Sequence, residues 1–356
     1  MYPKLVTDLD ILHGNAKNIV QISKDLGISI IGITKGFCGD IQIAKVLEES
    51  GVAGLGDSRM KNIISLREGG IKVPLWLLRI PMQSEVDKIA HYVDGLYISE
   101  LSTAQKLSEA AQKAGREIDL ILMVEMGDLR EGILKENLFE VAREMSKLPN
   151  LNLQGIGSNF ACYGGVIPTT AVLQEMVDLQ EKLRKELGLP LPILSGGNSS
   201  SVGLLPWKVP AGVTQLRLGE AILFGQEACE RKPISGSSQD GFTLFAEVVE
   251  VQIKNSIPTG EIGIDAFGKV PQFKDRGSRK RAIVAVGRQD TVPEDLFPLW
   301  GGVEILGASS DHMLLDVENA SPEVTVGMII PFRIRYYSGM LQGFTSDYVT
   351  KEYKQT

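Results

Sequence analysis

The sequence has few cysteines and histidines and no long hydrophobic run. Its three cysteines, Cys38, Cys162 and Cys229, show no CxxC spacing, so we expect neither a disulfide framework nor a metal site. No apolar run approaches the roughly 18 residues that a transmembrane helix needs, and the start, MYPKLVTDLD, lacks the apolar stretch of a signal peptide. The net charge of -7, without a basic block, gives no support for nucleic-acid binding. We therefore expect a cytoplasmic protein that binds neither membranes nor nucleic acids.

Short apolar segments alternate with longer amphipathic ones between residues 29 and 219. The eight apolar segments are 29–34, 52–56, 74–80, 95–99, 119–126, 152–158, 192–197 and 214–219. Their continuous apolar character is typical of strands buried on both faces. Helical patterns such as 102–115 and 169–187 lie between most of them, with Ser102 as a candidate N-cap and Gly115 and Gly188 as candidate ends. Eight such units in about 190 residues predict an α/β protein with a closed (β/α)8 barrel rather than an open sheet.

The pattern changes after Arg231. A turn-rich segment, GSSQDG at 236–241, precedes strand-like segments at 245–253, 281–287, 303–307, 312–317 and 328–336, and no long helical period follows. Such a pattern is typical of an antiparallel sheet. We therefore predict two domains, a barrel over residues 1–232 and a mostly antiparallel β domain over residues 233–356.

Functional residues of a barrel lie at the C-terminal ends of its strands. The loop after the seventh strand reads SGGNSSS (195–201). Its glycines let backbone amides approach a ligand and its hydroxyls add donors, which suits a phosphate. Gly219, which ends the eighth strand, completes the usual phosphate position of such barrels. The alternative is a polar loop that caps the next helix.

Lys35 directly follows the first strand, where partial desolvation would lower its pKa and let the amine form an imine. The alternative is a lysine that extends into solvent. A lysine facing a phosphate loop suits a cofactor with an aldehyde at one end and a phosphate at the other. Arg217 lies inside the eighth strand and needs a partner, for which a barrel-wall carboxylate is the alternative explanation. Arg130, in GDLREG, has the alternative of an exposed turn residue.

The whole chain resembles the alanine-racemase-like enzymes of fold type III, which depend on pyridoxal 5'-phosphate (PLP), and among them most closely the ornithine racemases. The segments that carry the resemblance are GDLREG (127–132), CYGGVIP (162–168), SGGNSSS (195–201), LRLGEAILFG (216–225), GEIGIDAFG (260–268) and ILGASSDH (305–312). The resemblance implies racemisation of an amino acid, ornithine or another basic one, by proton exchange on two faces. It also implies a head-to-tail homodimer in which each β domain reaches the partner subunit's active site.

The resemblance also implies roles for single residues. Lys35 would form the imine with PLP and move the α-proton on one face, and Arg130 would orient the substrate carboxylate or the ring oxygen of the cofactor. Arg217 would face the pyridine nitrogen and keep it unprotonated, which weakens the ring as an electron sink and favours racemisation over transamination. We expect cofactor contacts from Asn159, Asn198, Ser199, Gly219, Glu220 and Tyr337. We expect substrate contacts from Arg130, Cys162, Tyr163, Ser310 and Asp311.

The chain departs from alanine racemases at three points. Gly39 replaces a tyrosine after the cofactor lysine, and Met123 replaces a lysine seven residues before Arg130. The tyrosine that works from the other subunit has no equivalent around Asp265. The acid/base of the second face is therefore open, and the candidates, in order, are Asp265, His312, Ser309 and Cys162. We expect Asp265→Asn to keep the cofactor absorbance and lose racemisation.

Other functions remain open at this point. A fold-type III amino-acid decarboxylase shares the architecture, although such enzymes usually place a carboxylate at the pyridine nitrogen, where this chain has Arg217. A PLP-binding homeostasis protein consists of the barrel alone, a phosphate-binding barrel enzyme would lack PLP, and an alanine racemase would act on alanine. If the substrate has a distal amine, Asp128, Asp311 and Glu220 are candidate partners.

Overall fold

A computed structural model describes residues 1–265, 267–268 and 270–355. The chain divides into two compact units, one formed by residues 10–239 and the other by residues 1–9 together with 240–356. The sequence placed residues 1–9 in the barrel domain, and this assignment is corrected here. The first strand, β1 (Lys4–Asp8), pairs with β10 (Phe242–Asn255) and so belongs to the second unit.

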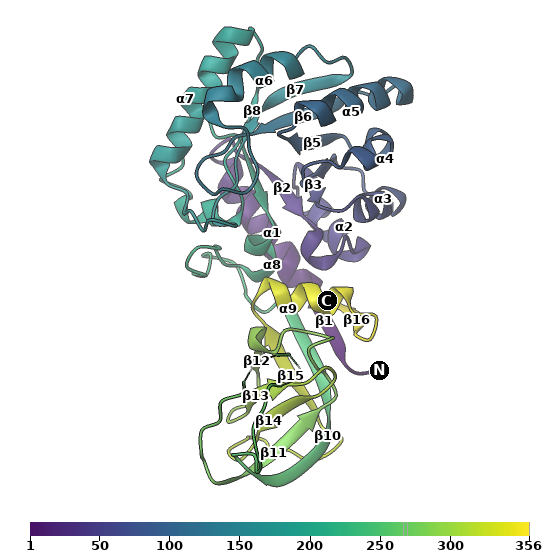
Figure 1. Cartoon of the computed structure of the whole chain (residues 1–356), viewed down its shortest axis with the longest axis vertical. Coiled ribbons are helices and arrows are strands. Elements are labelled where there is room, and N and C mark those ends of the chain that lie inside the picture. The colour runs from purple at the N-terminus through teal and green to yellow at the C-terminus, as the bar shows by residue number, and fades with distance from the viewer. Residues whose placement is uncertain (266, 269, 356) are drawn as a thin grey trace. The chain divides into compact units, whose positions relative to one another are not determined.

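The first unit is the predicted barrel (Figure 1). Eight parallel strands close on themselves because β9 pairs with β2. In chain order they are β2 (Ser29–Ile33), β3 (Gly54–Asp57), β4 (Leu75–Leu77), β5 (Gly95–Ile98), β6 (Ile118–Met123), β7 (Leu151–Gly157), β8 (Ile193–Ser195) and β9 (Gln215–Leu218). Each of the eight apolar segments contains or overlaps one strand, so the predicted fold class is confirmed.

Helices alternate with these strands. They are α1 (Leu9–Lys24), α2 (Ile41–Glu49), α3 (Met60–Glu68), α4 (Val86–Tyr92), α5 (Leu101–Ala114), α6 (Leu138–Met145), α7 (Thr170–Leu187) and α8 (Glu220–Phe224). Short 3-10 helices occur at η1 (Lys35–Phe37), η2 (Gln83–Glu85), η3 (Lys135–Asn137), η4 (Ser199–Leu204) and η5 (Pro293–Asp295). Gly115 and Gly188 end α5 and α7 in the left-handed conformation, as predicted. The predicted N-cap Ser102 is wrong, because Glu100 precedes α5 and makes no side-chain capping bond.

Large side chains fill the barrel interior. The cluster comprises Ile31, Ile33, Trp76, Tyr97, Ile121 and Met123, all buried. Trp76 and Tyr97 pack with their ring centroids 5.6 Å apart. Gly95 makes room for this packing, because a Cβ atom at that position would lie 2.5 Å from the Trp76 ring. The interior is thus a packed core, which leaves the strand ends as the place for chemistry.

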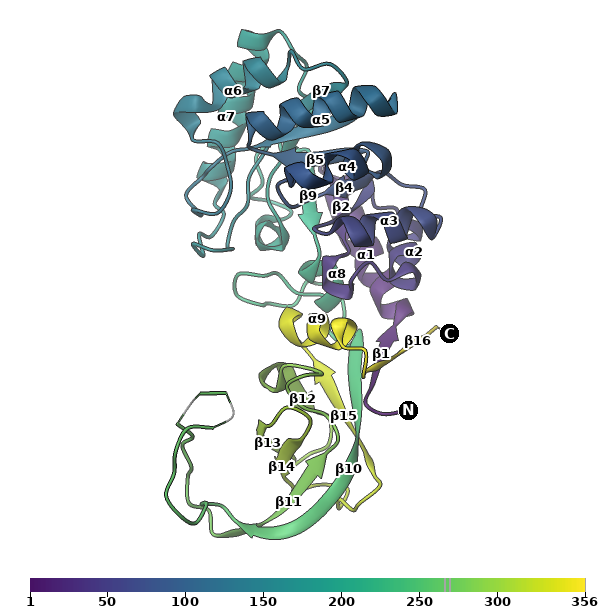
Figure 2. The ribbon, with the colours of Figure 1, turned by 45° about the vertical axis from the view of Figure 1, so that its right-hand side comes forward.

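The second unit is the predicted β domain, with strands in the order β12-β15-β10-β11-β14-β13 (Figure 2). Every neighbouring pair in this path is antiparallel. The additional strands are β11 (Ser278–Val284), β12 (Leu296–Pro298), β13 (Glu304–Ala308), β14 (Met313–Asp316) and β15 (Ile329–Ile334). Antiparallel β10 and parallel β16 (Thr350–Lys354) flank β1.

The sequence missed four elements of this unit. They are β1, β12, β16 and the helix α9 (Tyr337–Thr345). Two of the nine residues of α9, Gly339 and Gly343, are poor helix formers, which hides the helical pattern. Within the residues that the structure describes, no helix has both the length and the apolar character needed to cross a bilayer.

Candidate active site

Lys35 lies at the C-terminal mouth of the barrel. It begins η1 directly after β2, and only Thr34 separates it from the strand. The residue is exposed to solvent, but nearby protein atoms partly desolvate its amine. This partial burial, together with the charge of Arg130, lowers the pKa of Lys35 below its usual 10.5. A neutral amine is therefore available at lower pH than for an ordinary lysine, which suits a nucleophile or a proton acceptor.

Asp57 supports this end of β2 from the neighbouring strand. The carboxylate is completely buried and accepts hydrogen bonds from Thr34 Oγ1 at 2.5 Å, from the Arg59 amide at 2.8 Å and from Asn62 Nδ2 at 3.1 Å. Burial raises its pKa. The sequence analysis did not identify Asp57, although an acid directly after the apolar segment 52–56 was a visible signal.

Arg217 is buried in β9, with 5% of its surface exposed. Its guanidinium donates to Ser195 Oγ, to the Ser158 carbonyl at 2.6 Å and to Asn159 Oδ1 at 2.8 Å. These acceptors are a hydroxyl, a carbonyl and an amide. Arg217 is therefore held by these neutral groups, and not by the barrel-wall carboxylate considered from the sequence. Burial lowers the pKa of Arg217, but a guanidinium remains protonated in proteins.

Tyr97 forms the floor under this arginine. The Arg217 guanidinium lies 4.8 Å from the centre of the Tyr97 ring, within the range of a cation–π contact. The Tyr97 hydroxyl donates to Gln215 Oε1 at 2.7 Å. Complete burial raises the pKa of Tyr97 to about 12, so its proton stays in place. Tyr97 therefore positions Arg217 and takes no part in proton transfer.

A hydrogen-bonded chain connects Arg217 to Arg130. Asn159 accepts from Arg217 and donates to Glu131, and Glu131 in turn accepts two bonds from the Arg130 guanidinium. Arg130 also contacts Cys162, with 3.0 Å between Nη1 and Sγ. Arg130 is thus a partly exposed residue with a fixed side chain, not a free turn residue. The sequence analysis missed Glu131, because nothing in GDLREG shows which way its carboxylate points.

The SGGNSSS loop caps a short helix, and it also brings a hydroxyl to the start of α8. Ser199 is buried, and its Oγ accepts from the amides of Gly219 at 3.3 Å and Ala221 at 3.1 Å. Asn198 caps η4 through the Ser200 amide at 2.9 Å. The hydroxyl and the first turn of α8 therefore meet in the region where the sequence placed a phosphate. The carboxylate of the neighbouring Glu220 pairs with Arg231 at 2.9 Å.

Asp128 holds the loop that follows β7. Its buried carboxylate accepts from the amides of Cys162 at 3.2 Å, Tyr163 at 3.1 Å and Val166 at 3.2 Å. These three bonds show that the carboxylate positions the loop, a role that the sequence analysis did not predict. The Tyr163 side chain is 80% exposed, and the structure shows no role for it in the site.

The other predicted residues, Asp265, Ser309, Ser310, Asp311, His312 and Tyr337, lie in the β unit, separate from the unit that holds Lys35. Asp265 and Ser309 line a cavity of about 770 Å³, together with Arg288. The Arg288 amide donates to the Ser309 carbonyl at 2.9 Å. Asp311 pairs with His312 at 3.3 Å. Tyr337 begins α9.

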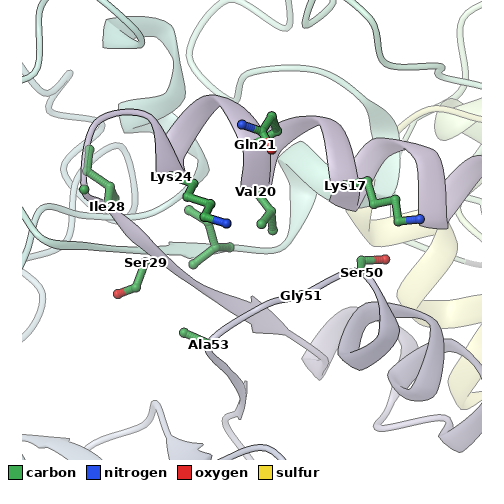
Figure 3. Close-up of a pocket in the computed structure, with 11 residues that line it drawn as sticks. Lys17, Val20, Gln21, Lys24, Ile28, Ser29, Ser50, Gly51 and Ala53 are labelled. Atoms are coloured by element: carbon green, nitrogen blue, oxygen red, sulfur yellow. The ribbon is translucent and has the colours of Figure 1, made fainter.

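A second hollow lies at the opposite end of β2 from Lys35. This groove of about 700 Å³ is lined by residues at the start of β2, such as Ser29, and by Ala53, just before β3. Lys17 and Lys24 extend from α1 above it (Figure 3). The N-terminal ends of barrel strands serve stability rather than catalysis, so the groove is not the site of the chemistry expected for Lys35.

Comparisons with known proteins agree with this geometry. Residues 7–227 match the model of the alanine racemase N-terminal domain. An ornithine racemase from Acetoanaerobium sticklandii is 43% identical over 354 residues, and a lysine racemase from Thermotoga maritima is 40% identical over 355 residues. Each alignment covers 99% of both chains. The solved alanine racemase of Clostridium difficile 630 superposes with a TM-score of 0.77 at 19% identity, covering 99% of this chain and 95% of that chain, and shares the fold.

Proposed function

Because the chain belongs to the alanine racemase family, we propose that it is a PLP-dependent racemase of a basic amino acid, ornithine or lysine. The observation that carries this proposal is the similarity to an ornithine racemase and a lysine racemase, each over 99% of the chain. Such coverage includes both units and not the barrel alone. The same two relatives favour a basic substrate over alanine.

The residues at the barrel mouth suit PLP. Lys35 supplies an amine with a lowered pKa for the aldehyde. Ser199, whose oxygen is held by the amides of Gly219 and Ala221, supplies a hydroxyl proton for the phosphate. Arg217 supplies a buried cation for the ring nitrogen. When bound, PLP would withdraw electrons from the substrate α-carbon and acidify its proton.

Three side chains of the mouth would transfer the proton, bind the cofactor ring and bind the substrate carboxylate. Lys35 would accept or donate the α-proton on its own face, and its lowered pKa brings the amine closer to neutral pH. Arg217 would donate an N–H to the ring nitrogen and keep its own proton. Arg130, fixed by Glu131, would hold the substrate carboxylate.

We also propose a head-to-tail homodimer in which the β-unit cavity with Asp265, Ser309 and Arg288 completes the partner's site. The support is that the structure gathers these residues, far apart in sequence, around one hollow. A cytoplasmic location completes the proposal, since the three cysteines are free thiols, as in a reducing compartment.

Racemisation should be measured with each enantiomer of ornithine, lysine, arginine and alanine. We expect loss of optical rotation without release of CO2, fastest with ornithine or lysine. Release of CO2 would show a decarboxylase instead, and preference for alanine would show an alanine racemase. Reduction with borohydride should fix PLP to Lys35, and a protein that takes up no PLP would contradict the proposal.

A further inference from the structure

A racemase needs a proton donor and acceptor on each face of the α-carbon. Lys35 serves one face, and the sequence left the other face open. The missing group must be titratable, reachable from the mouth and close enough to Lys35 for one substrate to meet both. These three conditions can be tested on the described residues around Lys35.

Lys35 follows β2 and Cys162 follows β7, so both lie at the C-terminal mouth of the barrel. Four side chains, Arg130, Cys162, Asp57 and Arg217, act on the charge of Lys35 there. The two arginines keep their protons. Asp57 is completely buried, and three donors already occupy its carboxylate. Of these four groups, Cys162 is the one that is both exposed and carries a proton on a side chain that can be a donor or an acceptor.

Two hydrogen-bond donors fix the position of the Cys162 sulfur. Arg130 Nη1 lies 3.0 Å from the sulfur, and Asn198 Nδ2 lies 3.6 Å from it. Both are donors, so they hold the sulfur in place as a hydrogen-bond acceptor. The backbone of Cys162 is fixed by the bond from its amide to Asp128 at 3.2 Å. The thiol is therefore held beside Arg130, the residue expected to hold the substrate carboxylate.

We propose that Cys162 is the acid/base of the second face, a role that rests on the proposed racemase function. In one direction Lys35 accepts the α-proton, the electron pair stays on the α-carbon, and the Cys162 thiol donates a proton to the opposite face. In the other direction the thiolate accepts the proton and the Lys35 ammonium donates one. One C–H bond breaks and one forms, and no oxidant or reductant is needed.

The test compares Cys162→Ala and Cys162→Ser holoenzymes with wild type in D2O, using each enantiomer separately. NMR follows α-deuteration, and chiral chromatography follows racemisation. Cys229→Ser is the matched control, because this half-buried thiol contacts the Ser200 carbonyl, at 3.6 Å, and not Arg130. Cofactor absorbance verifies that each variant is folded and loaded.

We expect both Cys162 variants to keep PLP and to lose racemisation by at least about 100-fold. One enantiomer should still exchange its α-proton with retention, through Lys35, and the other should become inert. A purely structural loss would reduce both exchanges together. Iodoacetamide followed by mass spectrometry gives a readout independent of turnover: Cys162 should be alkylated faster than Cys229, and substrate should protect it.

Racemisation by Cys162→Ala within about threefold of wild type would overturn the assignment. So would one-sided exchange in Asp265→Asn with normal Cys162 variants, because the second donor would then come from the β unit. A wild-type chain that racemises none of the amino acids would defeat the proposed function itself. That result is distinct from a racemase that remains active without Cys162.

Discussion

The barrel mouth and the β-unit cavity differ in how their polar side chains are held. At the mouth, bonds join distant parts of the chain, such as Arg217 to Ser158 and Arg130 to Cys162. In the β unit, the side chains of Asp265 and Ser309 accept bonds from near neighbours, the Phe267 and His312 amides, while the Ser309 carbonyl accepts from the more distant Arg288 amide. Long-range bonds fix a constellation in advance, as catalysis requires. We therefore expect the proton transfers to depend more on the side chains of the barrel mouth than on those of Asp265 and Ser309.

The sharpest test of this comparison is Lys35→Ala. We expect racemisation to fall by about 10⁴-fold, because the variant loses both the amine for the cofactor and the acid/base of one face. Lys24→Ala, in the groove at the other end of β2, is the control and should behave as wild type. Comparable activity of the two variants, measured with both enantiomers, would remove Lys35 from the site.

Arg217→Met should have the next largest effect. It leaves the three acceptors of the guanidinium unpaired inside the barrel, and we expect the free energy of unfolding to fall by about 3 kcal/mol. Urea denaturation measures this loss. Arg217→Lys keeps the charge but not the fork of donors and should lose less stability. Unchanged stability in Arg217→Met would show that this network does not hold the mouth together.

Asp128→Asn tests the loop that carries Cys162. The amide can accept fewer bonds than the carboxylate from the three backbone amides it must satisfy, and we expect a loss of about 1–2 kcal/mol. Hydrogen exchange should accelerate over residues 160–166 and not in the β unit. Normal protection of this loop would contradict the role given to Asp128.

Arg130→Gln should shift a pH profile. The charge of Arg130 lowers the pKa of Lys35, so its removal raises that pKa and leaves less neutral amine at a given pH. The rate at which the cofactor-free protein takes up PLP should therefore begin to rise at higher pH. A shift towards lower pH would mean that Arg130 does not act on Lys35.

The smallest effect is expected from Asp265→Asn, which changes an exposed side chain with a local bond. If Cys162 serves the second face, Asp265 only lines the partner's site and exchanges no proton, so kcat/KM should change by less than about threefold. This expectation replaces the loss of activity predicted from the sequence alone. A loss of 100-fold or more would return the second acid/base to the β unit and reverse the comparison between the two regions.

The sequence predicted much of the barrel because its geometry follows from local patterns. The apolar segments and the rule that strand ends carry function drew attention to Lys35, Arg217 and the SGGNSSS loop, and the family resemblance then singled out Ser199 and assigned the roles. The sequence analysis did not predict the roles of Glu131 and Asp57 or the loop role of Asp128, because the partners of a carboxylate depend on side-chain direction and on residues distant in sequence. In the β unit, the strands β1 and β16 were not predicted for a related reason. Each is five residues long, and they pair with each other across nearly the whole chain.

The pairing of β1 with β16 also sets an order for assembly. Every barrel strand pairs with its sequence neighbour except at the closing seam between β2 and β9, so the barrel can form while the ribosome is still at work. Lys4 can pair with Thr350 only after residue 350 has been synthesised, so this edge of the second sheet forms late. Such a late, long-range contact slows folding. During synthesis one edge of β1 can pair with β10 early, while the other edge stays open until residues 350–354 have emerged.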